Sequence, residues 1–124
     1  MADELPVLPA KRKLEPLCQK IGLTTIRAVV DDFYDRIQHH PTLAEPFAIV
    51  GDWTLHKERL THYWLTVMGG LPYQDFRYAL GDKHAPVGVT NALVDDWLQL
   101  FHETMLDHLD ADLAKRWLGL ASGI

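Results

Sequence analysis

The sequence predicts an all-α domain, and two observations carry this prediction. Apolar residues recur at steps of three and four along several segments, which is the period of a helix with one buried face. Sustained alternation of apolar and polar residues is missing, as are the Asn-Gly and Asp-Gly dipeptides of tight hairpins, so strands are not indicated. The 124 residues contain no internal repeat and no linker, which predicts a single domain over residues 1–124.

The first clear helical pattern lies between residues 24 and 41. Its apolar face is formed by Ile26, Val29, Val30, Phe33, Tyr34 and Ile37. We expect Thr24 or Thr25 to cap the start of this helix and Pro41 to mark its end. Residues 1–22 are expected to form an N-terminal extension or a short first helix interrupted by Pro16.

A short turn over residues 41–47 brings Phe47 toward the domain and precedes a second long helix. Asp52 is expected to cap this helix, which covers residues 53–68, and Gly69 lies just beyond its end. A shorter helix is expected over residues 73–84, where Phe76, Leu80 and His84 lie roughly on one side.

The C-terminal third predicts two further helices, which brings the total to about five or six. Thr90 can cap the first, over residues 91–109, and the second follows Asp110 over residues 111–121. The longer helix has apolar residues at successive steps of four, namely Leu93, Trp97, Phe101 and Met105. The longer helices are expected to pack in crossed pairs.

Charge and cysteine content exclude several classes of protein. A net charge of −5 argues against nucleic-acid binding, which needs a basic face. Cys18 is the single cysteine, so neither an intrachain disulfide nor a cysteine-based zinc site is possible. The most apolar stretch, residues 63–73, is too short to cross a bilayer, and no signal peptide is indicated. We therefore expect no membrane association and a cytoplasmic location.

Four polar residues lie on apolar helix faces or at a helix end. His84 stands two residues before Pro86, at the expected last turn of a helix, and Tyr34, His56 and Trp97 each lie on a core-facing stripe. Taken singly, each has a plain interpretation. A histidine is favourable at a helix C-terminus, His56 could be half solvated, and Tyr34 and Trp97 could be ordinary core residues. Together, on four different helices, they suggest one axial ligand and a set of hydrogen-bond donors around an apolar cavity.

The remaining histidines do not predict a zinc site. No His-Glu-x-x-His motif occurs, and the other five histidines are expected at the surface: His39, His40, His62, His102 and His108. The single serine, Ser122, argues against a hydrolytic triad, and no glycine-rich phosphate loop is found.

In its motifs the sequence resembles the truncated haemoglobins, and within them the third of the family's three groups. The resemblance covers residues 24–105 and rests on motifs in a specific order: "DDFYDRI", "HPTLAEPF", "DWTLHKERLTHYWLTVM", the histidine of "GDKH", and "LVDDWLQLF". It implies a shortened globin fold, a two-over-two helical sandwich around haem b.

The resemblance also implies a role for individual residues. His84 corresponds to the proximal iron ligand, Tyr34 and Trp97 to the distal phenol and indole, and His56 to a distal gate that could become a sixth ligand. Phe47 corresponds to the phenylalanine that wedges against the porphyrin edge. The expected pocket walls are Phe33, Leu60, Tyr63, Trp64, Leu80 and Leu93, and Arg77 and Lys83 are candidate partners of the haem propionates.

The implied function is the binding of O2, NO, CO or similar small ligands. Two donors, each contributing about 1 kcal/mol, would slow oxygen release by roughly one to two orders of magnitude, which is unsuited to oxygen transport. Removal of NO or of reactive oxygen species fits better, through a nitric oxide dioxygenase or peroxidase-like reaction that needs a separate reductase. Two alternatives remain open: a bis-histidyl electron-transfer or redox-sensing module that uses His56, and a haem-free helical interaction domain.

Overall fold

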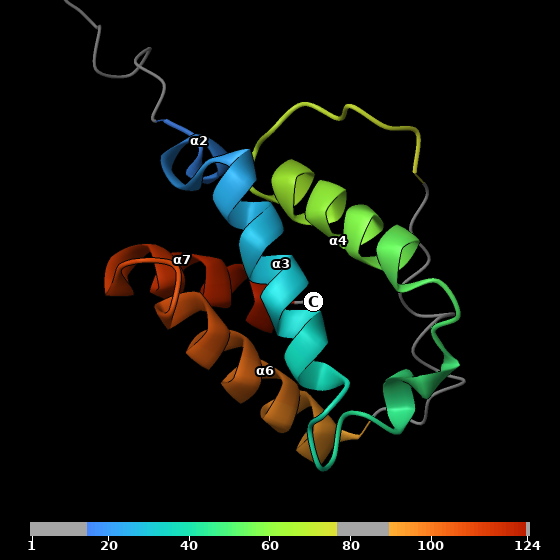
Figure 1. Cartoon of the computed structure of the whole chain (residues 1–124). Helices are drawn as coiled ribbons and strands as arrows, with labels where there is room; N and C mark the ends of the chain where they lie inside the picture. Colours follow the sequence, from blue (N-terminus) through green and yellow to red (C-terminus); the bar gives the residue numbers. More distant parts are fainter. Residues whose placement is uncertain (1–14, 77–89, 124) are drawn as a thin grey trace, which may run out of the picture.

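A computed structural model describes residues 15–76 and 90–123 of the chain, and these residues are all-helical (Figure 1). They form five α-helices and one short 3₁₀ helix, and no strand occurs among them: α2 (Leu17–Ile21), α3 (Leu23–Ile37), η1 (Pro46–Ile49), α4 (Trp53–Val67), α6 (Asn91–Leu106) and α7 (Ala111–Ser122). The predicted fold class is confirmed. Within the same ranges, no helix is both long enough and apolar enough to span a membrane.

Side-chain caps fix the starts of three helices, and the caps predicted at Asp52 and Thr90 are confirmed. The carboxylates of Asp52 and Asp110 and the hydroxyl of Thr90 each accept a backbone N–H from the third residue that follows, at the start of α4, α7 and α6 respectively. The cap predicted at Thr24 or Thr25 is wrong. Helix α3 begins at Leu23, directly after Gly22, whose φ of +90° makes a sharp turn between α2 and α3 that favours glycine.

The longer helices form two pairs, and α3 is the central element that joins them (Figure 1). Helix α3 packs against both α4 and α6, and α6 packs against α7, while the short α2 contacts α3, α4 and α7. The arrangement agrees with a two-over-two globin sandwich, in which α3 and α4 form one pair and α6 and α7 the other.

The two pairs meet at Phe101 of α6. Its ring stacks on Phe33 of α3, with centroids 4.4 Å apart and an interplanar angle of 15°. Trp64 of α4 and Trp117 of α7 contact the same ring at 5.6 and 5.3 Å. Since large aromatic side chains contribute most to core burial, Phe101 links α3, α4 and α7 into one hydrophobic core.

The chain leaves α4 through Gly69, which has a φ of +95° and lies just beyond the C-cap Met68, as expected. The helix predicted over residues 73–84 is not present in its first part, because residues 73–76 are not helical. Its second part lies outside the described residues, and so do four residues with predicted roles: Arg77, Leu80, Lys83 and His84.

Candidate functional site

Tyr34 is the polar centre of the predicted site. Its side chain lies on the buried face of α3 and is only 3% exposed. Burial raises the pKa of the Tyr34 phenol well above its ordinary value, and a hydrogen bond with the Trp97 indole opposes that rise only in part. The phenol therefore keeps its proton at neutral pH, and α3 and α6 bring the two predicted donors into contact.

His56 of α4 completes this group and lies among three aromatic rings. The imidazole meets the Tyr34 ring edge-on, with centroids 5.0 Å apart and an interplanar angle of 86°. Trp53 contacts it at 5.5 Å and 82°, and Phe47 at 6.4 Å and 73°. We call these five residues the Tyr34 cluster: Tyr34, Phe47, Trp53, His56 and Trp97. Sequence reasoning missed Trp53, although its position three residues before His56 places both on one side of α4.

Local structure explains how the cluster forms. Pro46 opens η1 and brings Phe47 beside α3, and the Asp52 cap starts α4 at Trp53. The Lys57 ammonium donates to the carboxylates of Asp31 and Asp35 at 2.8 and 2.7 Å, which joins the first half of α4 to α3.

The charge on Lys57 is stable in this position. Partial burial would lower the pKa of Lys57, but the hydrogen bonds and charges of Asp31 and Asp35 outweigh burial, and the pKa is raised. The cluster is therefore flanked by an ion-paired seam between α3 and α4 that persists across the physiological pH range.

Several apolar side chains, two of them in the cluster, remain partly exposed. They pack against the core without being fully covered by it: Phe47, Leu60, Tyr63, Leu93 and Trp97. Leu60 and Tyr63 follow His56 along the same face of α4, at steps of four and seven residues. This combination of uncovered apolar walls and a few convergent polar atoms is typical of a binding site for a largely apolar ligand.

Two other predicted wall residues lie deeper in the molecule. Phe33 is fully buried and contacts the rings of Tyr34 and Trp97 at 4.9 and 5.3 Å, so it supports the cluster from behind. Trp64 is 2% exposed and packs on Phe101 and Trp117, in the core between the helix pairs.

The surface position predicted for His62 is wrong. Its side chain is 2% exposed, and its Nε2 accepts the backbone N–H groups of Tyr73 and Gln74, both at 3.2 Å. The ring also contacts Tyr73 and Phe76 edge-on, at 4.8 and 5.4 Å. Helical periodicity could not reveal this contact, because it depends on how the chain folds back over α4 after Gly69.

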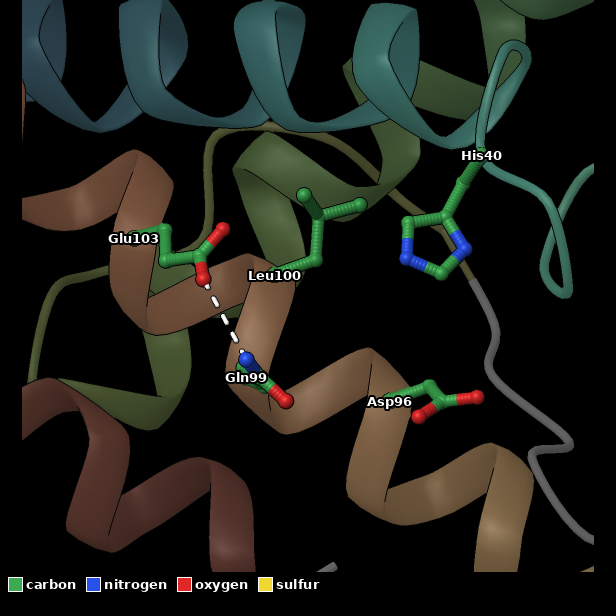
Figure 2. Close-up of a pocket in the computed structure, with 5 residues that line it drawn as sticks. All are labelled: His40, Asp96, Gln99, Leu100 and Glu103. Carbon is green, nitrogen blue, oxygen red and sulfur yellow. Dashed lines mark hydrogen bonds between the residues drawn. The ribbon is translucent and has the colours of Figure 1, made fainter.

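Next to the C-terminal end of α3, a small polar pocket of about 130 Å³ is a weaker candidate (Figure 2). It is lined by His40, Asp96, Gln99, Leu100 and Glu103. Its polar groups bond to near neighbours, since Gln99 donates to Glu103 at 3.4 Å and the Thr42 hydroxyl donates to Asp96 at 2.7 Å. Without extended apolar walls, this pocket lacks the usual features of a cofactor site.

Two comparisons with known proteins agree with this geometry. The family model of the bacterial-like globins matches residues 17–120 of the chain. The Group 2 truncated hemoglobin YjbI of Bacillus subtilis (strain 168) is 31% identical to it over 96 residues, which cover 73% of this chain and 69% of that protein.

Proposed function

The chain belongs to the bacterial-like globin family, whose members bind haem, and on that premise we propose that it holds haem b and binds O2, NO or CO beside Tyr34 and Trp97. The observation that carries the proposal is the placement of the Tyr34 side chain, which is buried on α3 and packs edge-on against His56 of α4, while Phe33 contacts both Tyr34 and Trp97. In this proposal His84 holds the iron, and Arg77 and Lys83 pair with the propionates.

The described residues fit a haem on the side of the Tyr34 cluster. A porphyrin is a flat and mostly apolar group, and Phe47, Leu60, Tyr63 and Leu93 offer apolar surface that the protein alone does not cover. When bound, haem supplies an iron whose sixth coordination position accepts a diatomic ligand. The polar atoms of the cluster then face a site that is otherwise apolar, where hydrogen bonds are strong.

Trp97 and Tyr34 act in sequence: Trp97 donates to Tyr34, and Tyr34 donates to the ligand. An indole N–H can only donate, so in their hydrogen bond the phenol oxygen is the acceptor. The phenol proton is left to point at an electronegative ligand atom, and the Trp97 bond polarises it further. The raised pKa of Tyr34 keeps this proton in place at neutral pH.

Strong donors favour retention and reaction of a ligand over delivery. We therefore propose a role in the removal of NO or of reactive oxygen species. The overall conversion of NO and O2 to nitrate consumes one electron, so this role requires a separate reductase as a partner.

We also propose a cytoplasmic location and membership of the third group of truncated haemoglobins. The five motifs from "DDFYDRI" to "LVDDWLQLF" support the group, whereas 31% identity to a group 2 protein shows the family alone.

The first test is the visible absorption spectrum of the purified protein, ferric and then reduced with dithionite. A Soret band with a five-coordinate or water-bound ferric pattern is expected. A low-spin bis-imidazole pattern would instead support the alternative in which His56 binds the iron. Failure to take up added haem would contradict the proposal and favour a haem-free helical domain.

The second test removes the Tyr34 hydroxyl. Tyr34→Phe should speed oxygen release roughly tenfold, because a hydrogen bond to a partly charged acceptor contributes about 1.5 kcal/mol. Stopped-flow displacement of O2 by CO measures this rate. Tyr73→Phe removes the same atom from an exposed position outside the cluster and should leave the rate unchanged. Equal release rates in wild type and Tyr34→Phe would show that Tyr34 is not the donor.

A further inference from the structure

Trp53 is the ring of the Tyr34 cluster to which no sequence motif gives a role. It is the first residue of α4 and lies three positions before His56, so the two side chains emerge on the same side of the helix. Its ring meets the His56 imidazole at 5.5 Å and 82°, and the Tyr34 ring at 6.1 Å and 43°. Trp53 therefore contacts both the proposed donor and the histidine next to it.

Tyr34 is the most buried of these three rings. Its side chain is 3% exposed, whereas His56 and Trp53 are each only partly buried. The imidazole packs edge-on against both other rings, and Trp53 also contacts Tyr34 directly, so each ring contacts the other two. His56 and Trp53 therefore cover Tyr34 together on the side of α4.

The backbone beside this pair is held on both sides. The Asp52 side chain caps the first turn of α4, and Lys57 joins the next turn to Asp31 and Asp35 on α3. With the helix fixed, rotation of the His56 side chain away from Tyr34 would uncover the phenol. The Trp53 ring packs edge-on against the imidazole, and this contact opposes such a rotation.

We propose that Trp53 is a positioning residue that holds His56 across the route to Tyr34 and thereby sets how fast a diatomic ligand arrives. The inference rests on the proposed ligand-binding function and adds the residue that regulates access to that site. An edge-to-face aromatic contact corresponds to about a two- to tenfold change in an equilibrium constant, so the fraction of open His56 should change by about that factor.

The experiment measures the association rate of CO with the reduced holoprotein after laser photolysis. Trp53→Ala should raise this rate about two- to tenfold. Trp53→Phe, which keeps a ring in place, should stay near the wild-type rate. Leu55→Ala is the matched control, because Leu55 lies on the same turn of α4 and is 48% exposed. If Trp53→Ala fails to fold, Trp53→Leu provides the same comparison.

The decisive comparison repeats Trp53→Ala in a His56→Ala background. If Trp53 acts by holding His56, its removal should have little further effect there, since the double-mutant cycle isolates the coupling between the two side chains. An unchanged rate in Trp53→Ala would overturn the inference, and so would an equal acceleration in both backgrounds. A shift of the ferric protein to a low-spin bis-imidazole spectrum would overturn it as well. In each of these cases the proposed function still holds if the wild-type protein takes up haem and CO. If the wild-type protein takes up no haem, both the proposed function and the role of Trp53 are overturned.

Discussion

Tyr34 shows how its surroundings give a single hydroxyl its chemistry. In water a phenol is both a donor and an acceptor with many partners. Here, burial raises its pKa, and a hydrogen bond with Trp97 opposes that rise only in part, so the phenol keeps its proton. Because that proton is retained well above neutral pH, the proposed donor strength of Tyr34 does not change across the physiological range.

His62 is the other residue whose role depends on tertiary contacts. Its Nε2 atom accepts two consecutive backbone N–H groups, which ties residues 73 and 74 to the middle of α4. A ring nitrogen accepts only when it carries no proton, so the neutral imidazole with its proton on Nδ1 is the form that fits these two bonds.

We expect His62→Leu to lower the free energy of unfolding by about 1–3 kcal/mol, because both backbone donors lose their acceptor. Urea denaturation followed by circular dichroism measures the change. His102→Leu, at a partly exposed position on α6, serves as the control and should change stability by less than about 0.5 kcal/mol. Equal effects of the two substitutions would show that the hydrogen bonds of His62 do not stabilise the fold.

At the scale of elements, an ion-paired network joins α3 to the turn between α6 and α7. The Arg36 guanidinium pairs with both oxygens of Asp32 on α3 and with Asp107 after α6, and the His108 Nε2 lies 2.8 Å from Asp32. Burial alone would raise the pKa of Asp32, but hydrogen bonds from His108 and Arg36 outweigh it, and the pKa lies below the ordinary value of 3.8.

The pH dependence of stability follows from the direction of this shift. A carboxyl whose pKa is lower in the folded state stabilises the fold above its unfolded pKa, and that contribution is lost as the pH falls through the folded pKa. Asp32→Asn should therefore be less stable than wild type at pH 7, and the difference should shrink as the pH falls below 3.8.

Urea unfolding at a series of pH values checks this expectation. Asp95→Asn is the control, since Asp95 is exposed and should leave the slope of stability against pH near that of wild type. A constant difference between Asp32→Asn and wild type from pH 7 to pH 3 would show that the ionised Asp32 is not what stabilises this junction.

At the scale of the whole molecule, Phe101 connects the core to the proposed site. It stacks on Phe33, contacts Trp97 at 5.0 Å, and meets Trp64 and Trp117 on its other sides. Phe33 and Trp97 in turn support Tyr34. The two helix pairs therefore cannot shift relative to each other without moving the donors, so the fold itself maintains the geometry of the site.

The sequence alone determined the four longer helices and much of the candidate site. Apolar periodicity and the caps at Asp52, Thr90 and Asp110 depend on residues close together in the chain, so they can be read locally. The same periodicity places Tyr34, His56 and Trp97 on inward faces. The order of the five motifs from "DDFYDRI" to "LVDDWLQLF" indicates the globin family.

Tertiary structure alone decided the contacts between residues far apart in the chain. It placed Trp53 against His56 and Tyr34, buried His62 under residues 73–76, and turned Trp64 toward Trp117. Helical period fixes which face a residue occupies, but not which neighbouring element covers that face. That choice depends on how the two helix pairs and the segment after Gly69 pack together, since the free energy of burial is shared among elements that no single stretch of sequence contains.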